Sequence, residues 1–332
     1  MGFISNLYTN DLNKIIAESQ NPKERLVNVA WPSESMVQVG PYAVGECKRA
    51  MFYKILGVKQ SNIGTVEGRH IMDAGIMYES YHIERFKKHG LYLNDQIRIE
   101  FEMPNTINKV INSGKLDVTI KVENKIHGIE IKSISAYKSP KIMEPDKSLP
   151  LPAANNLMQA MLYKYHTSSK LGYESLKIDD IYLMYVNRSD GAAFFYLVEL
   201  DSEGFAILTA IDGSGKQLFK VVLQDQLEFN ALLSQPSVDS DQARLAELRI
   251  NINDIFKKFD DVYTHAREKV LPPCDYKMIY TATELDQELH LKRISKIKYN
   301  KVKKDGESLG DTKCAYCSYR TQCLSDNGIK FK

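Results

Sequence analysis

The stretch GKLDVTIKVENKIHGIEIK, residues 114–132, predicts two strands joined by a turn. Apolar side chains alternate with polar ones in its first half, at Leu116, Val118, Ile120 and Val122. Because successive side chains of a strand point to opposite faces, Asp117 lies on the polar face of this strand, and Glu130 and Lys132 share one face of the next. The polar turn at residues 123–125 is typical of a hairpin. The pattern therefore predicts that Asp117 lies beside Glu130.

The polar groups of this hairpin suit the hydrolysis of a phosphodiester. Carboxylates are hard oxygen ligands for Mg²⁺ or Mn²⁺, and such a metal lowers the pKa of a bound water and offsets charge on the phosphate. An ammonium group such as that of Lys132 can orient the water or stabilise the transition state. A Glu-x-Lys pattern alone also fits a solvated strand face with alternating charges. The addition of Asp117, and of Gln159 and Tyr163 on a following helix, favours a metal-dependent nuclease site.

At these residues the chain resembles the PD-(D/E)xK nuclease superfamily. Within it, the similarity is to the RecB-like branch, which includes CRISPR-associated adaptation nucleases, AddB-type nucleases and many phage exonucleases. The resemblance implies that Asp117 and Glu130 bind the metal, with the carbonyl of Ile131 as a further ligand. It also implies that Lys132 is catalytic.

Two helices carry the other motifs of this branch. Its Gln-x-x-x-Tyr pair corresponds to Gln159 and Tyr163, which the resemblance expects to position the site or the DNA. An upstream helix contains Gly75-Ile-Met-Tyr-Glu79, similar to the Gly-x-x-x-Glu element of lambda exonuclease and different from the histidine form of the CRISPR-associated members. Glu79 is the catalytic candidate on this helix. His82, one turn further on, is a candidate metal ligand, and the sequence leaves open which of the two faces the metal.

The cysteines give a second, independent signal. There are five, at Cys47, Cys274, Cys314, Cys317 and Cys323. The last three have the spacing C-x2-C-x5-C, which allows thiolates to converge on one metal centre. Zinc suits four thiolates as well as an iron–sulfur cluster does, and disulfides are a further alternative. With no secretory segment in the sequence, we expect a reducing compartment in which thiols persist.

The first cysteine lies in Cys47-Lys-Arg49-Ala-Met-Phe-Tyr53, which is similar to the Cys-x-Arg…Tyr helix of the iron–sulfur RecB-like nucleases. This match implies a [4Fe–4S] cluster that joins the two ends of the chain as a structural staple. Its ligands would be Cys47, Cys314, Cys317 and Cys323. Cys274 has no role in the resemblance, and a small buried hydrophobe is the expectation for it.

Composition is that of a globular protein without a general affinity for polyanions. The chain has 332 residues with 43% hydrophobic content, enough for a sizeable core, and a formal net charge of only +2. A DNA-binding surface must therefore be local, and a basic run before the last cysteines is the candidate, with a solvated loop as the competing interpretation. Its leading residues are Lys292, Arg293, Lys296 and Lys298. No run of eighteen apolar residues exists, so we expect no membrane span and a cytoplasmic location, in the host if the protein is viral.

The expected elements follow one another in an order that fits the resemblance. They are helices over 1–60, a long helix over 65–89 closed by Gly90, a strand over 97–101, the hairpin, a helix with Gln159, strands over 181–186 and 193–200, and helix from about 203 to 270. The resemblance implies the α/β restriction-endonuclease-like fold, with an αβββαβ core, a mixed sheet, and helical terminal segments joined by the cluster. The expected parts are an N-terminal helical segment (1–64), the nuclease core (65–202) and a helical region with the C-terminal cysteines (203–332).

These expectations combine into a metal-dependent DNA nuclease, in particular an exonuclease acting on single strands or DNA ends. The preference for ends comes from the resemblance alone. A helicase, recombination protein or CRISPR adaptation protein is a possible partner. Two alternatives remain: a DNA-binding adaptor that kept the fold and lost cleavage, and a zinc-stapled structural module in which Asp117 and Glu130 are surface charges.

Overall fold

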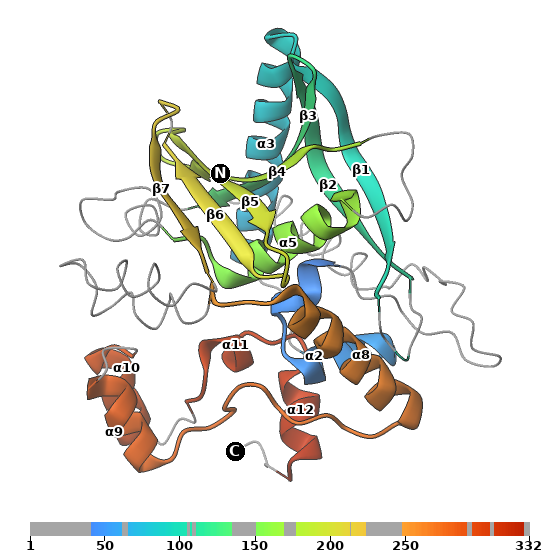
Figure 1. Ribbon diagram of the computed structural model, residues 1–332. Coiled ribbons are helices and arrows are strands. Elements are labelled where there is room, and N and C mark those ends of the chain that lie inside the picture. Colours follow the sequence, from blue (N-terminus) through green and yellow to red (C-terminus); the bar gives the residue numbers. More distant parts are fainter. Residues whose placement is uncertain are drawn as a thin grey trace, which may run out of the picture.

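One mixed sheet of seven strands organises the chain, with helices on its faces and a further helical group at one end (Figure 1). The computed structural model describes residues 41–61, 66–104, 107, 111–134, 151–168, 177–212, 214–223, 248–290, 294–305 and 309–328. The strands are β1 (Tyr92–Glu102), β2 (Ile111–Val122), β3 (Lys125–Ile134), β4 (Asp180–Asn187), β5 (Ala193–Leu200), β6 (Ala206–Ile211) and β7 (Gln217–Val222). The helices are η1 (Pro41–Gly45), α2 (Lys48–Ile55), α3 (Val66–Lys88), α5 (Ala154–Ser168), α8 (Ile252–Glu268), α9 (Ala282–His290), α10 (Lys296–Asp305), α11 (Thr312–Ala315) and α12 (Arg320–Asp326).

The strands lie side by side in their order along the chain. Neighbours are antiparallel except for β3 and β4, which run parallel. Parallel neighbours need a crossover, and α5 provides it. The predicted hairpin between β2 and β3 is confirmed, with a turn at residues 123–124 in which Glu123 takes the left-handed conformation at φ 54°. The expected order of a long helix, three strands, a helix and further strands is also confirmed.

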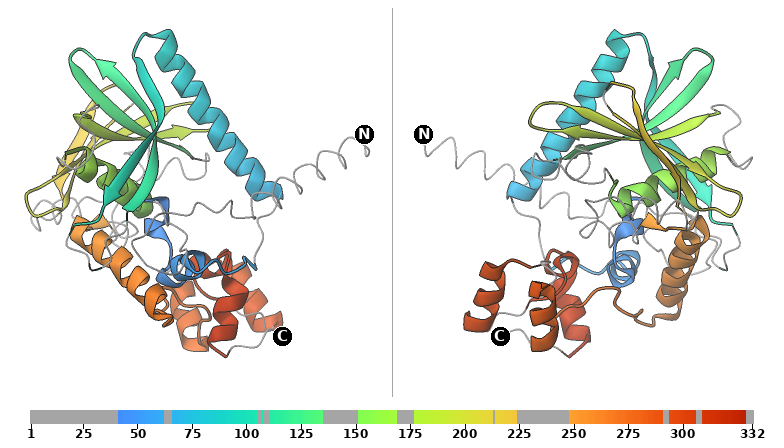
Figure 2. Two further views of the ribbon diagram at one scale, coloured as in Figure 1. Left: turned by 90° about the vertical axis from the view of Figure 1, so that its right-hand side faces the viewer. Right: turned by 60° about the vertical axis from the view of Figure 1, so that its left-hand side comes forward.

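The two faces of the sheet are covered by different helices (Figure 2). On one face α3 packs over β1, β2 and β3, where Ile83 joins Ile129 and Ile131 in an apolar cluster. On the other face α5 packs over β4 and β5 and joins the main core, which continues to α2 and α8. Because side chains alternate along β3, Glu130, the residue between these isoleucines, points to the side of the sheet that α5 covers.

The long helix ends as predicted, before Gly90 at φ 68°, and α2 ends before Gly57, whose φ is 66°. The helix expected from about 203 is wrong for residues 206–222, which form β6 and β7 and extend the sheet past residue 202. Short apolar runs of this kind do not separate strand from helix by periodicity. Helix α8 starts only at Ile252, after Asn251, whose side chain accepts the N–H of Asn253 at 2.9 Å. Among the described residues, no helix has the length and apolarity needed to cross a membrane.

Close packing at the centre of β3 gives a first testable prediction. A Cβ atom on Gly128 would lie 2.7 Å from both Ile181 Cδ1 and Leu116 Cδ2, whose side chains are fully buried. Gly128→Ala should therefore destabilise the fold by about 1–3 kcal/mol, because the core has to shift to accept the methyl group. Gly75→Ala is the control, since a Cβ there meets only Ser133 Oγ at 3.6 Å. Urea denaturation measures both, and equal stabilities for the two variants would contradict the prediction.

Candidate functional site

A fork in the sheet forms the centre of the site. The backbone ladder between β2 and β3 stops at Val118 and Ile129, although β2 continues beside β1 and β3 continues beside β4. Where the ladder stops, Oδ2 of Asp117 accepts the backbone N–H of Ile131 at 2.7 Å. A side chain thus replaces a missing backbone acceptor. The fork opens at Asp117, which faces the next residues of β3.

Glu130 and Lys132 occupy those next positions on β3. The Glu130 side chain is 2% exposed, and Lys132 Nζ lies 2.6 Å from its Oε1. The other oxygen, Oε2, is buried and has no hydrogen-bond partner within the described part of the chain. Burial raises the pKa of Glu130, and the Lys132 ammonium only partly offsets this. Burial acts to lower the pKa of Lys132, but the charge of Glu130, the hydrogen bond to Glu130 and the charge of Asp117 together outweigh burial and leave that pKa above its usual value.

A third carboxylate comes from α3. Glu79 accepts a 2.6 Å hydrogen bond from Gln96 Nε2 on β1. Burial, followed by the charge of Asp117, raises the pKa of Glu79 to about 7. Burial, followed by the charge of Glu130, raises the pKa of Asp117 to about 7 as well. Among the described residues, three carboxylates thus lie with one compensating ammonium, from Lys132, an arrangement that favours a bound cation.

The Gln-x-x-x-Tyr pair borders this space from α5, as the sequence predicts. Gln159 Nε2 donates to the Tyr163 hydroxyl at 3.2 Å, and that hydroxyl donates to the Lys115 carbonyl of β2 at 2.9 Å. Both side chains are buried. Burial, and then the Glu130 charge, raises the pKa of Tyr163, so its hydroxyl stays protonated. The pair thereby fixes β2 two residues before Asp117.

His82 lies outside this group of side chains, and its role as a metal ligand stays a prediction. It lines a separate cavity of about 690 Å³ between α3 and the turn that joins β4 to β5, together with Arg85 and Asn187. Burial lowers the pKa of His82. His82 lies three residues after Glu79, about 4.5 Å farther along the helix axis and about 60° short of a full turn. The two side chains therefore point in different directions. Glu79 is therefore the member of the pair that faces Asp117.

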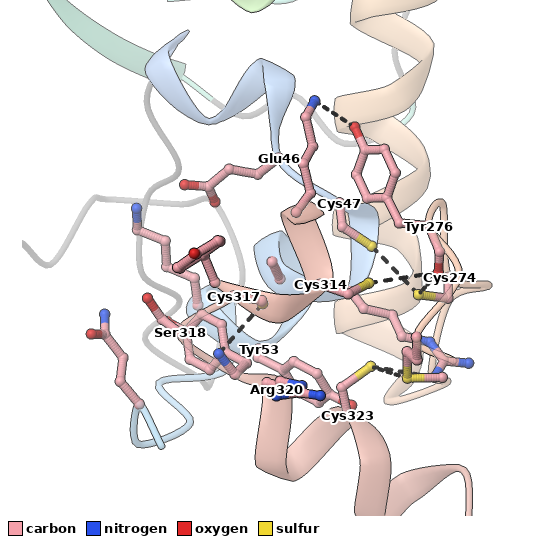
Figure 3. Close-up of a pocket in the computed structure, with 18 of the residues that line it drawn as sticks. Glu46, Cys47, Tyr53, Cys274, Tyr276, Cys314, Cys317, Ser318, Arg320 and Cys323 are labelled. Atoms are coloured by element: carbon pink, nitrogen blue, oxygen red, sulfur yellow. Dashed lines mark hydrogen bonds between the residues drawn. The ribbon is translucent and has the colours of Figure 1, made fainter. Parts of the chain in front are cut away.

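The cysteines form a second site, at the end of the molecule where the N- and C-terminal helices meet. All five line one cavity of about 260 Å³ between α2, the segment 272–278, α11 and α12 (Figure 3). Its thiols belong to Cys47, Cys274, Cys314, Cys317 and Cys323. The predicted meeting of the N-terminal cysteine with the C-terminal triplet is therefore confirmed as a placement of side chains. Cys274, expected to be an inert hydrophobe, shares the cavity.

Contacts within this cavity connect the thiols to both ends of the chain. Cys47 Sγ lies 3.9 Å from Cys274 Sγ. Arg49 Nη1 donates to Cys323 Sγ at 3.7 Å, and the backbone N–H of Tyr319 donates to the Cys317 sulfur at 3.4 Å. Burial raises the pKa of the thiols at four positions. These are Cys47, Cys314, Cys317 and Cys323.

A zinc ion and an iron–sulfur cluster require different spacings of their cysteine ligands. Within the described ranges, no three His, Cys, Asp or Glu side chains lie close enough together to hold a single ion. A zinc ion needs every sulfur about 2.3 Å from one centre. In a multi-iron cluster each cysteine binds a different iron, so the sulfurs stand farther apart. All five thiols line the same cavity, and such a set of donors suits either group.

The basic residues lie apart from both carboxylates and cysteines. Lys296 and Lys298 are exposed on α10, which packs against α9 through a 2.6 Å hydrogen bond from the Tyr299 hydroxyl to Asp286. This helix pair lies with the C-terminal helices, at the opposite end of the molecule from the upper part of α3 (Figure 1). The predicted residues Lys292 and Arg293 lie outside the described residues. The structure thus places the described lysines on a separate surface.

Comparison with known proteins adds little to this description. No known protein-family model matches the chain, and no curated protein sequence does. Among solved structures the chain is similar to the crystal structure of SSO0001, with a TM-score of 0.33 and 18% sequence identity, over 55% of this chain and 74% of the other. A similarity of this size supports no conclusion about activity.

Proposed function

We propose that the chain is a metal-dependent deoxyribonuclease of the RecB-like PD-(D/E)xK branch, with a [4Fe–4S] cluster in the cysteine pocket. One observation carries the proposal: Asp117, Glu130 and Lys132 meet at a fork between strands, where a buried carboxylate oxygen has no partner within the described ranges. The order α3, β1, β2, β3, α5, β4 agrees with the αβββαβ core of the restriction-endonuclease-like fold.

The residues at the fork fit Mg²⁺ or Mn²⁺. Glu130 Oε2 and the second oxygen of Asp117 are the candidate ligands, since Asp117 Oδ2 already accepts the Ile131 N–H. The Ile131 carbonyl is the third candidate, by the resemblance. Mg²⁺ keeps several waters and needs only one or two direct carboxylates, so three tightly converging side chains are not required. When bound, the ion would acidify a water and neutralise charge on the phosphate.

The remaining side chains position and polarise the reactants. Lys132 is held protonated by Glu130, and its ammonium can donate to a phosphate oxygen or orient the attacking water. Glu79, fixed by Gln96, can accept a hydrogen bond from that water. Gln159 and Tyr163 keep β2 in place behind Asp117. In the proposed reaction the water oxygen attacks phosphorus, and the bond to the leaving sugar oxygen breaks.

DNA as the substrate, with a preference for single strands or ends, follows from the resemblance. The lysines of α10 supply a local basic surface that can neutralise phosphates at a distance from the reaction centre. We propose the same classes of partner protein that the resemblance implies, namely a helicase, a recombination protein or a CRISPR adaptation protein.

The carboxylates give a prediction for the dependence of stability on pH. Since the pKa values of Asp117 and Glu79 are raised to about 7, the folded protein binds more protons than the unfolded chain between about pH 4 and 7. Stability without metal should therefore fall as the pH rises through this range. Mn²⁺ binds the ionised carboxylates, so it should raise the melting temperature more at pH 8 than at pH 5.5. Thermal unfolding measures both effects, and an increase that is the same at both pH values would contradict the assignment.

Cleavage of labelled DNA tests the function directly. Single-stranded and double-stranded substrates, labelled at either end, are incubated with the reconstituted protein and Mg²⁺, Mn²⁺ or EDTA. We expect cleavage with the metals and none with EDTA or with Glu130→Gln. DNA that is bound but not cut would support an adaptor instead. Visible absorbance at about 400 nm would distinguish an iron–sulfur cluster from zinc.

A further inference from the structure

Cys274 is one thiol more than a four-ligand cluster uses. It lines the same cavity as the four cysteines of the proposed cluster, and its Sγ lies 3.9 Å from that of Cys47. The Tyr276 carbonyl accepts from the thiols of both Cys274, at 2.9 Å, and Cys314, at 3.7 Å. The fifth thiol is thus placed beside two of the expected ligands.

The segment that carries Cys274 is fixed to the segment that carries Cys47. The backbone N–H of Asp275 donates to Cys47 Sγ at 3.4 Å, and its carboxylate accepts the backbone N–H of Lys48 at 2.8 Å. The Lys258 ammonium lies 3.8 Å from the same carboxylate and donates to the Glu46 carbonyl at 2.6 Å. The two thiols are therefore held as a pair by contacts that do not depend on the metal.

Cys317 and Cys323 have no such second thiol among the contacts of the described residues. The Cys317 sulfur accepts the N–H of Tyr319, and the Cys323 sulfur contacts Arg49 and the sulfur of Met278. For Cys47, by contrast, the sulfur of Cys274 lies 3.9 Å from its own sulfur. Figure 3 shows Cys47 and Cys274 directed toward each other from α2 and from the 274 segment.

We propose that Cys274 is an exchangeable ligand of the cluster, which binds the iron of Cys47 when the Cys47 thiolate is lost. This inference rests on the cluster of the proposed function. In the exchange the Cys274 thiol gives up its proton as its sulfur bonds to iron. The Cys47 sulfur leaves the iron and takes up a proton, so neither iron nor sulfur changes oxidation state.

Reconstitution of single and double variants tests the proposal. Each protein is loaded anaerobically with Fe²⁺ and sulfide, and absorbance at about 400 nm and iron per chain are measured. We expect Cys274→Ala to load like the wild type, and Cys47→Ala to retain at least about half of the iron, whereas Cys317→Ala and Cys47→Ala/Cys274→Ala should each lose most of it. If Cys47→Ala is as colourless as Cys317→Ala while the wild type loads, the exchange is wrong. A wild type that takes up no iron overturns the cluster itself and the exchange with it.

Alkylation gives a second readout that does not depend on colour. Iodoacetamide should modify Cys274 in the loaded wild type, because its thiol is free of iron. In loaded Cys47→Ala, Cys274 should be protected and should become reactive after iron is removed by a chelator. Mass spectrometry of the peptide around Cys274 distinguishes these states. Equal modification of Cys274 in both loaded proteins would overturn the proposal.

Discussion

Lys132→Met should reduce the rate of DNA cleavage by about 10²–10³-fold, the loss typical when one group that stabilises transition-state charge is removed. Lys132 is the one ammonium described beside the three carboxylates of the fork, with its Nζ 2.6 Å from Glu130. Methionine keeps the apolar part of the side chain and removes the charge. The burial that already raises the pKa of Glu130 would then act without compensation, so metal affinity should fall as well.

Lys121→Met is the matched control for this prediction. Lys121 belongs to β2 and is exposed, so its loss changes the net charge equally without touching the fork. Single-turnover cleavage with Mn²⁺ compares the variants, and thermal unfolding shows that both are folded. Cleavage by Lys132→Met at the rate of the Lys121 variant would refute the catalytic assignment.

Cys317→Ala should give a colourless protein whose melting temperature is lower by about 10 °C or more. Binding energy of a structural metal group is folding energy, and several kcal/mol correspond to such a shift in a chain of this size. Direct hydrogen bonds also join the ends, such as the 2.6 Å bond from the Tyr53 hydroxyl to Asp326. These contacts should keep the variant partly folded, with α11 and α12 less well held.

Cys274→Ala serves as the reference for this effect, since it removes a thiol from the same cavity and leaves the four expected ligands. Circular dichroism during heating compares the two variants after iron loading. A melting temperature of Cys317→Ala equal to that of Cys274→Ala would show that the cluster does not stabilise the fold.

Local patterns predicted the part of the site that lies on one hairpin. The alternation in residues 114–132 set the faces of Asp117, Glu130 and Lys132, and the structure places these side chains together. The ends of helices at Gly57 and Gly90 could also be predicted, because glycine readily adopts the positive φ that other residues avoid. Such features depend on neighbours in the sequence.

Features that depend on contacts between residues far apart in the sequence could not be predicted from local patterns. The fork requires β2 and β3 to choose different partners beyond Val118, which periodicity does not encode. Glu79 and His82 lie three residues apart on α3, and only the packing of this helix on the sheet decides which of them faces Asp117. The strands of residues 206–222 form because β5 offers an edge for pairing. Cys274 joins the other thiols through a fold that brings residues more than two hundred positions apart together.

The turn at residues 123–124 sets the strand register of the hairpin that carries the candidate site. It fixes the register in which Val122 pairs with Lys125, and that register sets which residues stand opposite one another as far as Val118 and Ile129, the neighbours of Asp117 and Glu130. Side chains alternate with a period of two, so a slip by a single residue would turn one of the carboxylates to the opposite side. The length of this turn is therefore constrained as strictly as the identity of the acidic residues themselves.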